Sequence, residues 1–138
     1  MQTHTRKTIL PVFFTIGAAI LFSCNDKEPT ADDKTGPDIS VALPDDNTVY
    51  APGDTIYYQA DIEDDSELSE MSVSLINGTD TVLLWPDATV NYGNIKSYTI
   101  NNWDIDIWNV NADATIQFKA VDKHDNSSTA DVPVQLTM

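Results

Sequence analysis

Residues 55–62 read TIYYQADI, and this run decides the fold class. Its apolar residues fall on every second position, with polar or exposed-type residues between them. The residues predicted to face inward are Ile56, Tyr58, Ala60 and Ile62. Alternation with a period of two is typical of a β-strand that buries one face. A strong turn signal, residues 51–54 (APGD), precedes the run, so we predict a strand that starts at Thr55.

The same alternation recurs on both sides of this run. The further predicted strands are 38–43, 71–75, 81–85, 95–100, 103–110, 116–120 and 130–136, with a break near Asn101 and Asn102. Asn77-Gly78 is the best hairpin signal, and residues 111–113 and 122–128 are predicted to turn the chain. About seven or eight short strands of this kind predict an all-β fold. We expect an immunoglobulin-like β-sandwich over residues 38–138.

The N-terminal residues have a different pattern. Arg6 and Lys7 precede an almost wholly apolar run, residues 9–22, which is followed by Ser23 and Cys24. A basic start and a short apolar core are typical of a secretory signal, and LFSC at 21–24 resembles the cleavage box of bacterial lipoproteins. The resemblance implies removal of residues 1–23 and lipidation of Cys24, and several acyl chains anchor a protein firmly. An uncleaved apolar anchor with an incidental cysteine is the alternative.

Residues 24–37 are predicted to be the lipidated cysteine and a flexible tether. The segment is polar, contains Pro29, Gly36 and Pro37, and lacks apolar periodicity. Residues 26–28 (DKE) resemble the surface-export signal of Bacteroidetes lipoproteins, although an ordinary solvated linker fits equally well. The predicted location is the cell envelope, where lipid anchors the protein at the outer membrane. The sequence does not decide between the periplasmic face and the surface face of that membrane.

The charge of the chain limits its partners. Loss of residues 1–23 leaves five lysines against 22 acidic residues, a net charge of −17. Such a charge argues against nucleic acid or an anionic lipid surface as a direct partner. It fits a soluble extracytoplasmic domain and makes divalent cations plausible ligands. Because Cys24 is the only cysteine, the domain has no disulfide to stabilise it.

Three stretches carry a resemblance to a known family: residues 49–56 (VYAPGDTI), 60–68 (ADIEDDSEL) and 118–126 (FKAVDKHDN). They resemble the immunoglobulin-like domain of small Bacteroidetes lipoproteins of the uncharacterised DUF4625 type. More loosely, they are similar to cadherin-like and other bacterial immunoglobulin-like repeats. The resemblance covers roughly residues 37–138 and implies a fold rather than a function. The chain departs from the pattern at 111–113 and at 124–125, where a glycine is usual.

Two acidic loops predict a Ca²⁺ site. Six of the ten residues from Asp61 to Glu70 are acidic. In an immunoglobulin-like sandwich this loop and the loop before the last strand lie at the same end. The candidate ligands are Asp61, Glu63, Asp64, Asp65, Glu67, Asp122, Asp125 and Asn126. Ca²⁺ takes six to eight oxygen ligands, but the spacing is not that of an EF-hand. Acidic loops that simply keep the domain soluble are the alternative.

Trp85 and Trp108 are the candidate ligand-binding residues, because a tryptophan beside carboxylates on an exposed face is a common sugar-stacking arrangement. The alternative is that these rings fill the core. His124 lies near Asp125 and two serines, but residues of one loop do not easily form a catalytic triad. We therefore expect no enzyme.

The sequence thus predicts a lipid-anchored extracytoplasmic binding or interaction module, with stabilisation by Ca²⁺ as an open alternative. Its partners are the membrane, through Cys24, and a protein or glycan that the sequence does not identify. The alternatives are a carbohydrate-binding accessory lipoprotein of a glycan-uptake system and a structural or assembly subunit at the cell surface. A small hydrolase would need a deep pocket that joins His124 to acidic residues.

Overall fold

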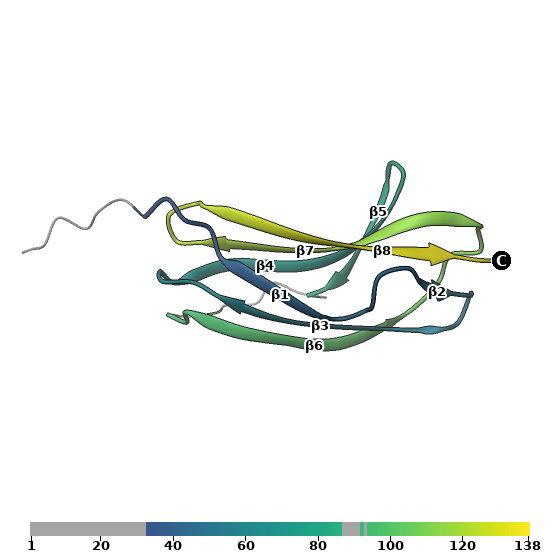
Figure 1. The fold of residues 1–138 in the computed structure, drawn as a ribbon, viewed down its shortest axis with the longest axis horizontal. Helices are drawn as coiled ribbons and strands as arrows, with labels where there is room; N and C mark the ends of the chain where they lie inside the picture. The colour runs from purple at the N-terminus through teal and green to yellow at the C-terminus, as the bar shows by residue number, and fades with distance from the viewer. Residues whose placement is uncertain (1–32, 87–91, 93) are drawn as a thin grey trace, which may run out of the picture. The chain divides into compact units, whose positions relative to one another are not determined.

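The computed structural model describes residues 33–86, 92 and 94–138. The predicted signal peptide, Cys24 and most of the predicted tether lie outside these residues. The described part contains eight β-strands (Figure 1). Their bounds are β1 Asp38–Leu43, β2 Thr48–Tyr50, β3 Thr55–Glu63, β4 Leu68–Asn77, β5 Asp80–Trp85, β6 Ser97–Ile105, β7 Ala112–Asp122 and β8 Ser127–Leu136. Among the described residues there is no helix with the length and apolar character needed to cross a bilayer.

The strands form two sheets, which confirms the predicted all-β sandwich. One sheet has the order β1-β3-β6 and the other β2-β8-β7-β4-β5. Figure 1 shows them as two layers, with β1, β3 and β6 in the lower one. β3 and β4 belong to different sheets, as do β5 and β6, so the chain crosses between the layers as in immunoglobulin-like sandwiches.

The core lies between the two sheets and is built from alternate residues of the strands. All four inward positions predicted for β3 are buried, with Ile56 and Ile62 fully inaccessible. On β7, Ile116, Phe118 and Ala120 are inaccessible as well. Tyr58 is among the largest buried side chains, and its hydroxyl donates to the carbonyl of Leu84 at 3.1 Å. The period-two pattern therefore identified the core-facing side of both strands correctly.

The hairpin predicted at Asn77-Gly78 is present between β4 and β5. Asn77 pairs with Asp80, which leaves a two-residue loop, and Gly78 has a φ of +60°. Glycine adopts this left-handed conformation without the steric cost that a Cβ brings, which explains the sequence signal.

The predicted break near Asn101 and Asn102 is wrong. β6 runs without interruption through both residues, because Asn101 pairs with Gln59 and Asn102 with Tyr58 of β3. Pairing along a full-length neighbour overrides the low strand propensity of asparagine. The strand predicted over 103–110 ends at Ile105. The partner of Ile105 is Thr55, the first residue of β3, so β3 offers no further pairing beyond it.

Leu43 also differs from its prediction. It was expected to face inward with Ile39 and Val41, but its exposed fraction is 39%. The register with β3 shifts between Val41 and Leu43. A bulge of this kind reverses the direction of the side chains that follow it, because neighbouring residues of a strand point to opposite faces.

Candidate metal centre

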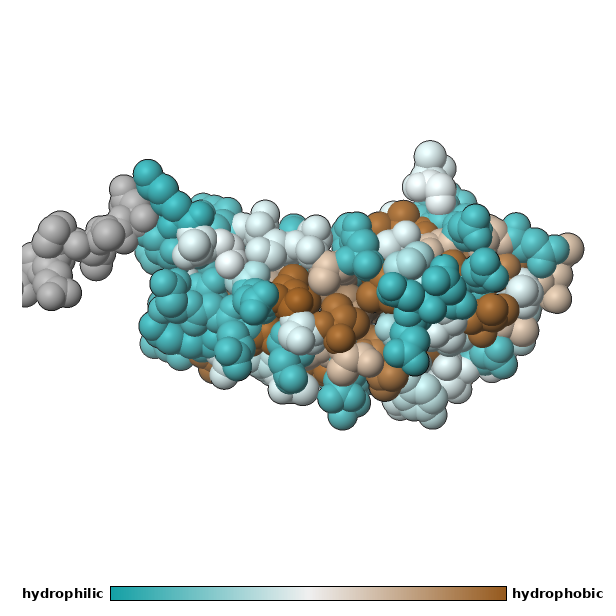
Figure 2. Space-filling model, in the orientation of Figure 1, coloured by the Kyte–Doolittle hydropathy of each residue, from teal (hydrophilic) through white to brown (hydrophobic). Residues whose placement is uncertain are grey.

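Three segments of the chain meet at the end of the sandwich where β1 begins, and Figure 2 shows hydrophilic residues gathered there. The segments are residues 33–37 before β1, the β3–β4 loop and the β7–β8 loop. The backbone N–H of Lys123 donates to the carbonyl of Glu67 at 2.8 Å, and the Asn126 side chain donates to the carbonyl of Asp33 at 3.1 Å. We call the set Asp33, Asp64, Asp65, Asp122 and His124 the acidic pole.

Asp122, at the end of β7, organises the β7–β8 loop. Its side chain is inaccessible to solvent. Oδ1 accepts from the backbone N–H groups of His124 at 2.7 Å and Asn126 at 2.8 Å, and Oδ2 accepts from the Asn126 amide at 2.8 Å and Ser66 Oγ at 3.1 Å. Burial by itself would raise the pKa of Asp122, but the hydrogen bonds from Asn126, His124 and Ser66 together lower it. Asp122 is therefore an ionised carboxylate held inside the fold.

Asp33 approaches the same loop from the segment before β1. Its Oδ1 accepts from the Thr35 hydroxyl at 2.7 Å and from the Thr35 backbone N–H at 3.0 Å. These two hydrogen bonds lower the pKa of Asp33 to about 2. Its Oδ2 is shielded from solvent and has no hydrogen-bond partner among the described residues. This oxygen lies 3.8 Å from His124 Nδ1, which is an ion-pair distance rather than a hydrogen bond, so it keeps the capacity to accept a donor or a cation.

Asp64 has the same local geometry as Asp33. Its Oδ1 accepts from the backbone N–H of Ser66 at 2.7 Å and from the Ser66 hydroxyl at 2.6 Å. In both cases the aspartate closes a turn with the residue two positions later, a common use of this side chain. Each turn occupies the Oδ1 oxygen of its carboxylate.

The carboxylates of the acidic pole converge on one another. One oxygen each from Asp33, Asp64 and Asp65 lie within 4.8 Å of one another. Asp33, Asp122 and His124 form a second such group, with His124 Nδ1 at 3.8 Å from Asp33 Oδ2 and 4.0 Å from Asp122 Oδ2. Both oxygens of Asp122 already accept hydrogen bonds, so the first group has more free coordination capacity. Hard oxygen ligands in a flexible arrangement suit Ca²⁺.

The lysines nearest to the acidic pole have other partners. Lys96 Nζ donates to the backbone carbonyl of Asp65, and Lys123 pairs with the carboxylate of Glu67. Neither interaction reaches the carboxylate oxygens of Asp33 or Asp64. Asp33 Oδ2 accepts no hydrogen bond among the described residues, which is compatible with a bound cation.

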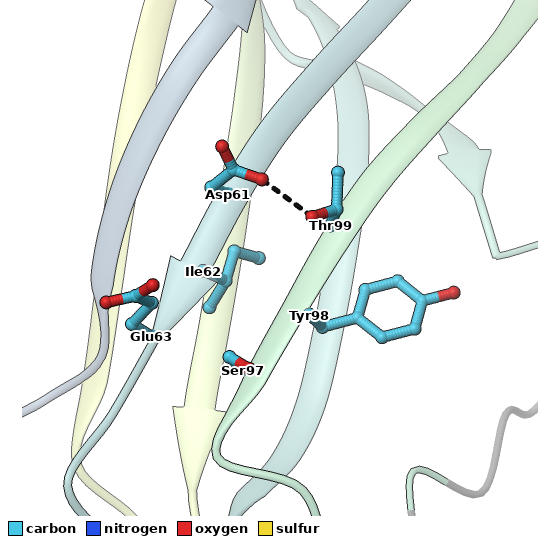
Figure 3. Close-up of a pocket in the computed structure, with 6 residues that line it drawn as sticks. All are labelled: Asp61, Ile62, Glu63, Ser97, Tyr98 and Thr99. Atoms are coloured by element: carbon cyan, nitrogen blue, oxygen red, sulfur yellow. Dashed lines mark hydrogen bonds between the residues drawn. The ribbon is translucent and has the colours of Figure 1, made fainter.

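The structure brings together only part of the predicted Ca²⁺ set. Asp64, Asp65 and Asp122 belong to the acidic pole, and Glu67 and Asn126 lie beside it. Asp125 is exposed in the β7–β8 loop with a φ of +64°. Asp61 and Glu63 lie apart, on the outer face of β3, where they line a shallow pocket of about 300 Å³ (Figure 3). Thr99 Oγ1 donates to Asp61 at 2.7 Å there.

Sequence reasoning missed Asp33 and His124 as members of this cluster. Asp33 falls within residues 24–37, the predicted tether, and the sequence offers His124 only as a candidate for a catalytic triad. A usable signal was present in the repeated spacing Asp-x-Thr at 33–35 and Asp-x-Ser at 64–66. At both places this spacing forms the aspartate turn that fixes the position of the carboxylate.

The candidate ligand-binding tryptophans are both half-buried and pack against the core. The Trp85 ring stacks on Tyr98 with centroids 5.8 Å apart and is tilted against Tyr92 at 6.2 Å. The backbone N–H of Trp108 donates to Asp106 Oδ1 at 2.9 Å. Trp103, which was not a candidate, is the more accessible ring, with an exposed fraction of 57%.

No protein-family model matches the chain, and no curated protein is significantly similar to it. The resemblance to DUF4625-type lipoproteins therefore stays a prediction from the sequence.

Proposed function

We propose that the chain is a lipid-anchored, extracytoplasmic binding module of immunoglobulin-like fold whose acidic pole holds Ca²⁺. The observation that carries the proposal is the set of carboxylates of Asp33, Asp64 and Asp65, which have one oxygen each within 4.8 Å of one another, together with an Asp33 oxygen that is shielded and accepts no hydrogen bond among the described residues. Anchoring rests on the sequence pattern at 21–24 and on the resemblance to lipoprotein signals that it carries.

A bound Ca²⁺ would offset the mutual repulsion of the ionised carboxylates at this end. It would also join the segment that precedes β1 to the β3–β4 loop, because Asp33 and the Asp64-Asp65 pair belong to different segments. The ion would supply stability and a fixed loop conformation rather than a reaction. The arrangement therefore supports a binding module with an ordered end.

Thermal unfolding of the full chain, purified in detergent, tests the Ca²⁺ site. Unfolding is followed with EDTA, with millimolar Ca²⁺ and with millimolar Mg²⁺. A site occupied at about 100 times its Kd adds about 2.7 kcal/mol to the free energy of unfolding. For a domain of this size, the expected rise in Tm is on the order of 10 °C with Ca²⁺ and much smaller with Mg²⁺.

Two variants make this test specific. Asp33→Asn removes the carboxylate with the unpartnered oxygen and is expected to abolish the rise in Tm. Asp61→Asn removes an acid on the outer face of β3 and is expected to preserve it. A wild-type Tm that ignores Ca²⁺, or an equal rise in Asp33→Asn, would show that the pole is a solvated acidic surface.

A further inference from the structure

The outer face of β3 and β6 is a regular ladder of paired side chains, each pair directly opposite across the two strands. The pairs, in order from the start of β3, are Thr55–Ile105, Tyr57–Trp103, Gln59–Asn101, Asp61–Thr99 and Glu63–Ser97. They alternate with the buried residues of β3, so all of them point away from the core. From first to last the ladder spans roughly 27 Å at about 3.4 Å per residue.

The second pair consists of two aromatic rings that solvent reaches freely. Tyr57 and Trp103 each have an exposed fraction of 57%, and Ile105 beside them has 40%. Tyr57 and Trp103 are directly opposed in the register of β3 and β6, where Cβ atoms are roughly 5 Å apart, so both side chains stand on the same face of the sheet. Large aromatic side chains gathered on one exposed face are a common feature of binding surfaces.

The remaining pairs supply hydrogen-bonding groups along the same face. Gln59 and Asn101 offer planar amides, which both donate and accept. Beyond them, Thr99 donates to Asp61, and Glu63 stands beside Ser97 in the shallow pocket of Figure 3. Along the ladder, the two aromatic side chains are thus followed by amides, hydroxyls and carboxylates.

The charge of this face limits its occupant. Among its described residues, the ladder carries two carboxylates, Asp61 and Glu63, and no cationic side chain. An anionic polymer would be repelled by these groups and by the net charge of −15. A second copy of the chain would bring the same carboxylates and the same negative charge against them, so self-association is disfavoured.

We propose that this face binds a neutral oligosaccharide. The apolar C–H faces of sugar rings would stack on Tyr57 and Trp103, and the ring hydroxyls would hydrogen-bond to Gln59, Asn101 and Asp61. An extended chain of several sugars would lie along the ladder. The proposal takes the chain to be a binding module, but it does not depend on a metal ion, because none of these residues belongs to the acidic pole.

An array of neutral and acidic oligosaccharides, probed with the full chain in detergent, tests the proposal. Probing is done once with Ca²⁺ and once with EDTA, so that failure of the metal site and failure of the glycan site are told apart. We expect binding to neutral glycans under both conditions and none to acidic ones. Titration of the best neutral glycan then gives the dissociation constant of each variant.

Trp103→Ala and Tyr57→Ala are each expected to weaken binding at least about ten-fold, whereas Trp103→Tyr should retain most of it. Leu83→Ala is the matched control, since Leu83 on β5 is 54% exposed but belongs to the other sheet. Its affinity should equal that of the wild type. The proposal is overturned if no neutral glycan binds, if acidic glycans bind equally well, if Trp103→Ala binds normally, or if sedimentation shows self-association that Trp103→Ala abolishes.

Discussion

Asp33 makes the acidic pole sensitive to acid pH. Hydrogen bonds from Thr35 lower its pKa to about 2, against 3.8 for an ordinary aspartate. The folded chain therefore takes up this proton less readily than the unfolded chain. The stabilisation is fully present above about pH 4 and is lost as the pH falls toward 2.

We therefore expect the Tm of the wild type to drop steeply between about pH 4 and pH 2. Asp33→Asn cannot ionise at this position and should show a shallower drop, measured by thermal unfolding in EDTA across that range. Asp80→Asn, in the β4–β5 hairpin, is the control and should follow the wild type. If the Tm of Asp33→Asn fell with pH as steeply as that of the wild type, the ionisation of Asp33 would not be the cause of the drop.

Residue patterns predicted the site only in part. Asp64, Asp65 and Asp122 were found because loops at one end of a sandwich can be recognised from strand order alone. Asp33 was missed because a polar segment with no periodicity gives no sign that it will dock. The exposure of Trp103 was undetermined, since alternation shows which residues share a face but not which face is buried.

Among the elements, the segment before β1 docks more closely than its composition indicates. A Cβ on Gly36 would lie 2.8 Å from Ser128 Oγ and 3.1 Å from the backbone of Ser127. A side chain at this position would require the Ser128 hydroxyl to turn away and the Ser127 backbone or the segment to shift by a few tenths of an ångström. Gly36 thus brings Asp33 within reach of the β7–β8 loop.

Gly36→Ala is expected to shift Asp33 and to weaken Ca²⁺ binding about ten-fold, which corresponds to about 1.4 kcal/mol. The Tm in EDTA should change little, because Gly36 precedes the first strand. Ca²⁺ titration followed by calorimetry measures the effect, and Lys34→Ala, an exposed neighbour, is the control. Unchanged Ca²⁺ affinity in Gly36→Ala would show that the position of the segment before β1 does not affect the Ca²⁺ site.

The β4–β5 hairpin allows a simple test of the observed register. At a φ of +60° Gly78 has open space around it, so Gly78→Ala adds only backbone strain. We expect a loss of roughly 1 kcal/mol, seen as a fall in Tm of about 5 °C. Gly78→Asn should lose less, because asparagine tolerates this conformation. Equal losses in both variants would argue against the observed turn.

Element boundaries were predictable where alternation and turn residues agree, as in β3 and at Asn77-Gly78. They were not predictable where pairing decides the outcome. β6 passes through two asparagines because β3 lies beside it along its whole length. No local pattern in β6 carries that information.

For the molecule as a whole, the anchor at Cys24 is the prediction with the widest consequence. Cys24→Ala removes the only cysteine and with it the sulfur that would carry the lipid. We expect this variant to leave the membrane fraction and to lose labelling by a radioactive fatty acid, while the wild type retains both. Ser23→Ala keeps a small residue before the cysteine and should behave as the wild type. Membrane retention of unlabelled Cys24→Ala would indicate an uncleaved apolar anchor instead.

The path of the chain from β1 to β2 has a mechanical consequence. β1 pairs antiparallel with β3 in one sheet, and three-residue β2 pairs parallel with the last strand, β8, in the other. The first part of the domain thus pairs with both sheets, β1 with one and β2 with the other. Tension applied between the N-terminal end and the end of β8 would pull β2 and β8 in opposite directions along their length. Their hydrogen bonds would be sheared together rather than opened one at a time, so the domain would resist force exerted through the segment before β1.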